Sequence, residues 1–377
     1  MSTFTRTDTS IVSRWWWTID RLTLLSIIII AALGAILVLA ASPAVAERIG
    51  LESFHFVHRH FVFLPLALAV MIATSLLTPR GVRRLALLVF LGALAGMVAV
   101  LFFGVETKGA TRWLSISGFS LQPSEFIKPT FAVVAAWMFA AQKLDEDVPG
   151  YAIAIFLFVL VVGLLLLQPD FGMSIVVSCV CAVQFFIAGL PMVLVGAIAL
   201  LFVLGAFGAY LSFDHVRLRI DRFLDPASGQ GYQVEKSLDA FENGGLFGRG
   251  PGEGRVKEVL PDAHTDFILA VAGEEFGLLL CLLIVILFGF VVLRGFARVF
   301  KDSNFFVMVA VTGLLTQFAL QAIINIASTT NLIPPKGMTL PFISYGGSST
   351  LALALGMGMV LALTRVRPGT HGTGGAR

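Results

Sequence analysis

The chain has little charge for its length. Of its 377 residues, 13% are Asp, Glu, Lys or Arg and 57% are hydrophobic, whereas a soluble domain averages about 25% charged and about 45–50% apolar residues. This composition, with a mean hydropathy of +0.91, excludes an ordinary globular protein. The formal net charge is +3, and no basic run interleaved with aromatic residues occurs, which argues against nucleic-acid binding.

Cysteine is also scarce, and the N-terminal segment does not have the pattern of a cleavable leader. The three cysteines, Cys179, Cys181 and Cys281, all lie inside apolar runs, where helix packing explains them better than a disulfide or a metal site. The N-terminal segment 15–17 is a run of three tryptophans that leads into a long apolar stretch with no small-residue cleavage site close behind. We expect these tryptophans to anchor the first helix at the membrane interface.

Apolar runs of about 20 residues, the length that crosses a bilayer, recur along the chain. They predict an all-α polytopic membrane protein with about ten transmembrane helices. The expected helices cover residues 22–42, 61–78, 83–104, 124–141, 150–168, 171–188, 190–212, 266–293, 305–331 and 343–364. A long polar segment, residues 213–265, separates helices 7 and 8. Residues 1–21 precede the transmembrane domain of residues 22–365, and the Gly- and Thr-rich residues 366–377 are expected to be disordered.

Lysine and arginine are divided unevenly between the two sides of the predicted bundle. An even number of spans puts both termini on one side, which carries Arg6, Arg14, Arg21, Arg80, Arg83, Arg84, Lys143, Arg294, Arg298, Lys301, Arg365, Arg367 and Arg377. The short loops of the other side carry only Arg48, Arg59, Lys108, Arg112 and Lys336. We therefore expect cytoplasmic termini and an extracytoplasmic loop 213–265, whose basic residues are interleaved with at least as many acids.

The long loop ends in a cluster of ionisable residues. Asp266 lies where the loop re-enters an apolar helix, close to Glu258 and His264. A partly desolvated carboxylate there has a raised pKa and becomes a better base, although a lone Asp at a helix start usually serves the helix dipole. No second His or Cys has ligand spacing to His264, which argues against zinc. Glycine-rich residues 244–254 precede this cluster and suit an anion-binding turn, or else a plain connector.

Two further segments break the apolar pattern. Glu125 and Lys128 are three residues apart on one helix face, so we expect a structural ion pair, with substrate lining as the alternative. The proline- and glycine-rich residues 334–349 survive at membrane depth only where protein or a water cavity covers them. This stretch contains Lys336, whose charge suits a phosphate; helix capping and tight packing are the plainer explanation.

Taken together, these segments resemble the SEDS family of bacterial cell-wall proteins. Residues 336–349 (KGMTLPFISYGGSS) look like the C-terminal signature of the family, and residues 122–128, 223–226, 244–254 and 261–268 match its other motifs in order. The similarity covers nearly the whole chain. Lys336-Gly337 before Thr339-Leu-Pro341 is more similar to the division branch, FtsW, than to the elongation branch, RodA.

The resemblance implies a peptidoglycan glycosyltransferase that polymerises lipid II into glycan strands during cell division. By motif position, Asp266 is the candidate base that accepts the proton of the attacking sugar hydroxyl. The leaving undecaprenyl pyrophosphate needs positive charge, and the resemblance leaves a divalent cation, Mg or Mn, open as a cofactor. The candidate substrate-binding residues are Arg219, Arg222, Lys336, Ser344, Tyr345, Gly346 and Gly347, and the candidate supporting residues are Glu125, Lys128, Glu258 and His264.

Two other functions fit the same sequence. A lipid II flippase would also use broken helices and intramembrane charge, and a scaffold that only recruits division proteins needs no catalysis; an elongation role fits the signature less well. The resemblance further implies a class B penicillin-binding protein, a transpeptidase, as partner, together with other division proteins. It places the chain in the bacterial cytoplasmic (inner) membrane, at the division septum.

Overall fold

The structure is a computed structural model that describes residues 10–107, 110–116, 119–144, 147–189 and 232–366, with single positions between 193 and 221. Within these residues, helices dominate. They are α1 (Ile11–Thr18), α2 (Arg21–Arg48), α3 (His55–Ser75), α4 (Pro79–Phe103), α5 (Pro123–Leu144), α6 (Gly150–Leu167), α7 (Phe171–Ala188), α10 (Tyr232–Gly244), α11 (Val256–Val259), α12 (Ile268–Val299), α13 (Phe305–Thr329) and α14 (Gly347–Leu363).

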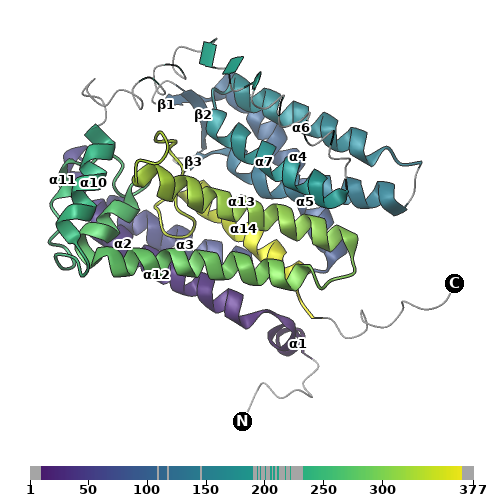
Figure 1. The fold of residues 1–377 in the computed structure, drawn as a ribbon, viewed down its shortest axis with the longest axis horizontal. Helices are drawn as coiled ribbons and strands as arrows, with labels where there is room; N and C mark the ends of the chain where they lie inside the picture. Colours follow the sequence, from purple (N-terminus) through teal and green to yellow (C-terminus); the bar gives the residue numbers. More distant parts are fainter. Residues whose placement is uncertain are drawn as a thin grey trace.

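Seven of the described helices are long and apolar enough to cross a membrane: α2, α3, α4, α6, α7, α12 and α13. They run lengthwise through the bundle, as Figure 1 shows. The multi-pass membrane protein expected from the sequence is thus confirmed. Helices α5 and α14 match two more of the ten expected spans in position, but α5 carries buried charge and α14 has 17 residues. Most of the expected span 190–212 falls outside the described residues.

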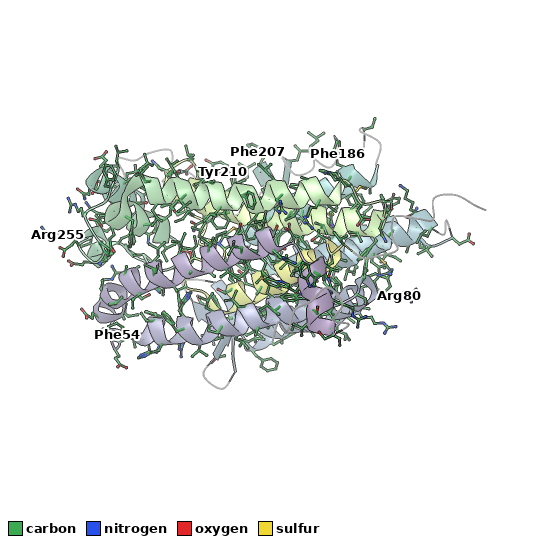
Figure 2. All side chains as sticks on the ribbon, turned by 90° about the horizontal axis from the view of Figure 1, so that it is seen from below. Phe54, Arg80, Phe186, Phe207, Tyr210 and Arg255 are labelled. Atoms are coloured by element: carbon green, nitrogen blue, oxygen red, sulfur yellow. The ribbon has the colours of Figure 1, made fainter. Side chains whose placement is uncertain are left out.

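The centre of the bundle is formed by α5, α13 and α14, whose side chains are mostly buried. Figure 1 shows α13 and α14 running side by side there. The outer faces of the surrounding helices carry exposed large apolar residues such as Leu88, Phe156 and Ile286, as a lipid-facing surface requires. Figure 2 places Phe54 and Arg255 at one end of this bundle and Arg80 at the opposite end.

A small antiparallel sheet joins α4 to α5 and was not expected from the sequence. Its strands, β1 (Val105–Thr107), β2 (Ala110–Ile116) and β3 (Phe119–Leu121), pair in the order β1-β2-β3. Strands β1 and β3, of three residues each, are too short to show an alternating apolar pattern. The sheet lies immediately before the Glu125 segment and so caps one end of α5.

Helix α12 is two helices joined by a sharp reversal. Gly277 has φ 80° and ψ −178°, a backbone conformation that glycine tolerates. The Leu269 carbonyl accepts a hydrogen bond from Cys281 Sγ at 3.8 Å, whereas twelve residues of straight helix span about 18 Å. Residues 268–276 therefore fold back on the start of residues 278–299. The latter, about 33 Å long at 1.5 Å per residue, are the part that spans.

This reversal corrects the continuous span expected over residues 266–293. Residues 268–276 form a re-entrant segment, and the spanning part begins at residue 278 and runs to Val299. The last expected span, 343–364, also begins later than predicted, at Gly347. Residues 342–343 are instead coil that packs on α2, where a Cβ on Gly34 would lie 2.3 Å from the Phe342 carbonyl oxygen.

The described part of the long loop is folded onto the bundle. Helices α10 and α11 carry a second small core that also contains Ala41 and Val45 of α2. Its other buried members are Ala240, Val256, Leu260, Ala263, Phe267, Ala270 and Val271. This core attaches residues 232–267 to the end of α2, so the segment that carries Asp266 has a fixed position.

Candidate functional site

Residues 264–266 lie against the C-terminal signature through their backbone. The His264 carbonyl accepts from the Tyr345 N–H at 2.9 Å, and the Thr265 carbonyl accepts from Ser344 Oγ at 2.5 Å. The Asp266 carbonyl accepts from Asn325 Nδ2 on α13 at 2.9 Å. Three consecutive carbonyl groups are thus each held by a donor, and the path of the chain through Asp266 is set by the signature and α13.

The Asp266 side chain is half-buried and lies beside the start of the signature. A Cβ on Gly337, which has φ 65°, would lie 3.6 Å from Asp266 Oδ2. Asn325 Nδ2 also donates to the Met338 carbonyl at 2.6 Å, so one amide group joins both segments. Lys336, also half-buried, precedes Gly337. The structure therefore brings together two residues, Asp266 and Lys336, that the sequence placed 70 positions apart.

His264 packs in an aromatic cluster. Its ring stacks on Phe56 with centroids 4.5 Å apart and lies 5.4 Å from the Tyr345 ring. Burial raises the pKa of the Tyr345 hydroxyl, and a hydrogen bond from Arg59 opposes that rise. Among the described residues, no three His, Cys, Asp or Glu side chains gather as a set that could hold a metal ion. The aromatic rings fix the turn that leads into Asp266.

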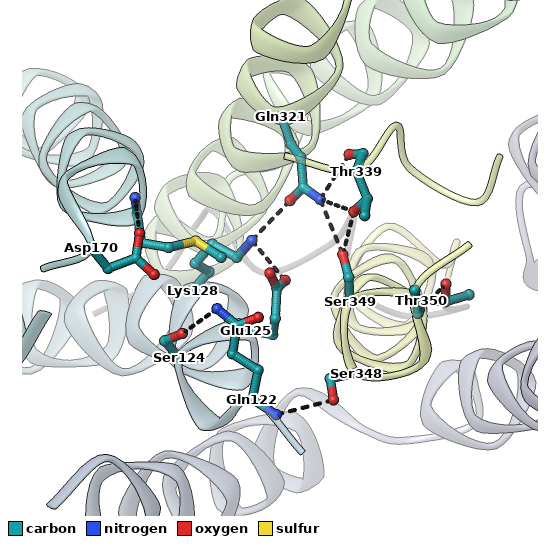
Figure 3. A network of polar contacts seen from close by, with 12 residues as sticks. Gln122, Ser124, Glu125, Lys128, Asp170, Gln321, Thr339, Ser348, Ser349 and Thr350 are labelled. Carbon is teal, nitrogen blue, oxygen red and sulfur yellow. Dashed lines mark hydrogen bonds and ion pairs between the residues drawn. The ribbon is translucent and has the colours of Figure 1, made fainter. Parts of the chain in front are cut away.

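Glu125 and Lys128 form the expected ion pair. Lys128 Nζ lies 2.8 Å from Glu125 Oε2 and donates to Gln321 Oε1 at 3.0 Å, and both side chains are buried. Gln321 Nε2 in turn donates to Thr339 and to Ser349 Oγ at 3.2 Å. Figure 3 shows this chain of contacts from α5 through α13 to the signature. The pair is therefore connected to the same signature segment that contacts Asp266.

Asp170 stands at the edge of this network. It caps the start of α7, and Arg112 NH1 of β2 lies 3.6 Å from its carboxylate. Burial raises the pKa of Asp170, and the Arg112 charge works against that rise. A Cβ on Gly172 would lie 3.2 Å from Met338 Cε, so the start of α7 also borders the signature. Four elements, β2, α5, α7 and α13, thus meet around one polar region.

The glycine-rich loop is an ordered structure built around two buried glutamates. Glu274 accepts from the backbone N–H groups of Arg255 and Val256 at 3.0 Å. Glu275 accepts from the Gly252 N–H at 2.8 Å and pairs with Lys257 Nζ at 2.5 Å. The loop also pairs with the reversal in α12 through its backbone: the Arg249 and Gly250 N–H groups donate to the Glu274 and Glu275 carbonyls. A floppy connector is therefore excluded for residues 249–257.

The remaining predicted residues are placed as follows. Gly346 and Gly347 begin α14, where Gly347 lies against the Phe63 ring and Gly346 against Thr339. Glu258 is exposed on α11, and its carbonyl accepts from Arg48. Arg219 and Arg222 lie outside the described residues.

Three residues of this region were missed from the sequence. Asn325 is 1% exposed and sits in an apolar run where a lone amide gives little signal. Glu274 and Glu275 are 0% and 1% exposed. They did carry a signal, because two adjacent acids followed by a glycine inside an apolar run mark a place where a spanning helix is broken.

Comparisons with known proteins identify the family of the chain. The family model described as "Cell cycle protein" (FTSW_RODA_SPOVE) matches residues 20–368. The chain is 46% identical to the "Probable peptidoglycan glycosyltransferase FtsW" of Caulobacter vibrioides, over 99% of this chain and 96% of that protein. It is 34% identical to the protein of the same name from Geobacter metallireducens, over 93% and 96%.

Two solved structures share the fold. A chain of the structure described as "Structural coordination of polymerization and crosslinking by a peptidoglycan synthase complex" matches with a TM-score of 0.76 and 28% identity, over 93% of this chain and 98% of that one. The rod shape determining protein RodA of Thermus thermophilus matches with a TM-score of 0.66 and 26% identity, over 93% and 97%. The chain therefore belongs to the FtsW/RodA/SpoVE family of cell cycle proteins.

Proposed function

We propose that this chain is a peptidoglycan glycosyltransferase that polymerises lipid II into glycan strands during cell division. The observation that carries the proposal is the setting of Asp266. Its backbone is fixed by Asn325, its carboxylate lies beside the signature segment, and its side chain is half-buried at the start of a re-entrant helix. Relatives that share nearly the whole chain carry the name of this activity and of the division branch.

In this reaction a hydroxyl oxygen of one lipid-linked sugar attacks the anomeric carbon of another glycan. The new carbon–oxygen bond forms as the bond to undecaprenyl pyrophosphate breaks, and the leaving group keeps the electron pair. Asp266 accepts the hydroxyl proton, a role that contributes about 10²–10⁴-fold in rate. Lys336, next to Gly337, offers positive charge to the pyrophosphate. Arg219 and Arg222 remain candidates for the same task.

The supporting residues would act through the backbone and the polar network. Ser344, Tyr345 and Asn325 hold the carbonyls of residues 264–266 and so position Asp266, while Ser344 and Tyr345 remain candidates for contact with the substrate. Glu125 and Lys128 brace the signature through Gln321, and Gly346 and Gly347 allow α14 to begin close to Thr339 and Phe63. His264 and Glu258 keep supporting roles in the turn and in α11.

A divalent cation would find few protein ligands here. The described residues offer no cluster of three metal-ligating side chains, so Mg or Mn would need substrate oxygens beside a carboxylate such as Asp266. That pattern is common for Mg²⁺ at phosphate groups, where the ion keeps waters and takes one or two carboxylates.

The proposal extends to surroundings and partner. The division-branch relatives and the unequal distribution of basic residues support the bacterial inner membrane, cytoplasmic termini and the septum. The matched synthase complex couples polymerisation to crosslinking by its own description, which supports a class B penicillin-binding protein as partner.

Purified Asp266→Ala tests the activity against its alternatives. Supplied with lipid II and the partner transpeptidase, the variant should form no glycan strands above background, while Glu253→Gln, an exposed acid in the same loop, should match the wild type. Strand formation by Asp266→Ala at the wild-type rate would refute the base assignment. A flippase would instead move labelled lipid II across vesicles without polymer, and a scaffold would support division in cells with Asp266→Ala.

A further inference from the structure

The end of α12 opposite the candidate site bears an unassigned hollow. It has a volume of about 510 Å³ and is lined by Phe290, Leu293, Arg294, Ala297, Arg298 and Lys301. These residues recur at intervals of three and four, so they share one face of the helix. Three of the six are basic, so positive charge is concentrated where the helix leaves the apolar part of the bundle.

Two of these cations are fixed in place by a buried carboxylate. Asp20, which is 2% exposed, accepts from Arg294 Nε at 2.8 Å and Arg294 NH2 at 2.9 Å. Arg298 Nε lies 3.0 Å from the same carboxylate. One carboxylate cannot neutralise two guanidinium groups, so the cluster keeps a positive charge. Both arginine side chains remain about one-third exposed, at 28% and 30%.

The remaining charges nearby are few. Lys301 is exposed at the rim of the hollow and adds a further positive charge. The neighbouring acid, Asp302, is turned to the loop that follows, where its carboxylate accepts from the Asn304 N–H at 2.8 Å. The hollow is therefore positive overall, and its arginines are already ordered, which lowers the entropy lost on binding an anion.

An apolar surface leads away from the cations along the same helix. Leu293 is 71% exposed, and Ile286 and Phe290 follow it toward the middle of the span as exposed residues. At the basic end, exposed Trp16 and Trp17 of α1 lie against Arg21, with ring centroids 4.9 and 4.6 Å from its guanidinium carbon. Tryptophans in such a setting mark the headgroup level of a bilayer, so the hollow lies where phosphates do.

From this arrangement we propose that the end of α12 binds an anionic phospholipid, whose headgroup contacts Arg294, Arg298 and Lys301 and whose acyl chain follows Leu293, Phe290 and Ile286. Arginine suits this task because its planar group can hold a phosphate through two hydrogen bonds. Basic pockets beside transmembrane helices bind anionic lipid headgroups by this chemistry. The site is independent of the reaction at Asp266 and lies at the other end of the bundle.

The test uses the purified full-length chain and native mass spectrometry in a mild detergent. Phosphatidylglycerol and phosphatidylcholine are titrated separately. The wild type should retain phosphatidylglycerol in preference. Lys301→Gln should weaken that retention about 5-fold, the effect of about 1 kcal/mol per basic residue at a charged membrane surface. The matched control, Arg80→Gln with Arg84→Gln, removes two exposed charges at the same end of the bundle and should leave retention unchanged.

Two further arms keep the proposal falsifiable. Leu293→Trp fills the hollow from an exposed position without touching the Asp20 pairs, and it should also reduce phosphatidylglycerol retention. Inorganic phosphate at millimolar concentration should not displace the lipid, because it lacks the acyl chain. Equal retention of both lipids, an equal loss in the Arg80 and Arg84 control, or displacement by phosphate alone would each overturn the proposal.

Discussion

The acidic residues at the two ends of the re-entrant segment, residues 268–276, are held by different contacts. At its tip, the carboxylates of Glu274 and Glu275 are buried and engaged by backbone N–H groups and Lys257. At its start, it is the backbone carbonyl of Asp266 that Asn325 holds, while the carboxylate is half-buried beside Gly337. Glu274 and Glu275 therefore hold the loop through their side chains, whereas Asn325 positions Asp266 through its main chain.

The largest expected effect is on turnover at the start of the segment. Asp266→Asn keeps the size and the backbone contacts of the residue but cannot accept a proton. The rate of lipid II polymerisation should fall by about 10²–10⁴-fold, the usual contribution of a general base. The thermal unfolding midpoint should stay within a degree or two of the wild type, since the half-buried Asn side chain is isosteric with Asp and the backbone contacts of residue 266 are kept. A large drop in that midpoint would make Asp266 a structural acid like the glutamates.

At the tip, the expected effect is on stability. Glu275→Ala leaves the buried Lys257 ammonium without its 2.5 Å partner, and breaking such a pair costs about 3–5 kcal/mol. Thermal unfolding in detergent should show this loss, and limited proteolysis should cut residues 249–257 faster. The double variant Glu275→Leu with Lys257→Met should recover part of the stability. No recovery would mean that the Gly252 hydrogen bond, and not the ion pair, holds the loop.

Asn325 is a structural residue whose loss should change turnover, because its amide holds the backbone carbonyl of Asp266. Asn325→Ala removes the donor to the Asp266 and Met338 carbonyls. A misplacement of about 1 Å at a reacting group can cost about 10²-fold, so we expect kcat to fall by about 10- to 100-fold with little change in KM. Thr330→Val, which loses a hydroxyl just past the end of α13, is the control. An unchanged kcat in Asn325→Ala would remove its positioning role.

The smallest effect concerns Asp20, at the far end of the bundle, whose carboxylate pairs with Arg294 and Arg298. Burial works to raise the pKa of Asp20, but hydrogen bonds from Arg294 and Thr23 and the Arg298 charge outweigh it and hold the pKa below 3.8. The stabilisation is therefore present above about pH 4 and is lost as the pH falls through the folded-state pKa. The free energy of unfolding of Asp20→Asn should therefore fall less than that of the wild type between pH 6 and pH 3. An equal fall in both proteins would contradict this role of Asp20.

Most of the bundle could be predicted from hydropathy, because a span of about 20 apolar residues is a strong signal. For the reversal at Gly277 the sequence offers only the two adjacent acids, Glu274 and Glu275, and the glycine after them, which mark a break but not its direction; the contact between Leu269 and Cys281 shows the fold-back. The pairing of Glu125 with Lys128 followed from their spacing. The connection of that pair to Thr339 did not, because it depends on Gln321, a neutral residue nearly 200 positions away.

Two candidate residues, Asp266 and Lys336, could be chosen from the sequence, but the contacts that bring their segments together could not. Asp266 and Lys336 stood out as charges at helix ends. The hydrogen bonds that join their segments run through backbone carbonyls and through Asn325, and backbone acceptors have no signature in a sequence. The same reason explains why the role of Ser344, which donates to the Thr265 carbonyl, became clear only in three dimensions.

The contrast between the two ends of the re-entrant segment can be tested in one paired measurement. The rate of lipid II polymerisation per folded molecule is compared for Asp266→Asn and Glu275→Gln, both assayed with the partner transpeptidase. We expect the Asp266→Asn rate to be at background and the Glu275→Gln rate to stay within about threefold of the wild type, because the second change leaves the base in place. Polymerisation by folded Asp266→Asn at the wild-type rate would contradict the central claim.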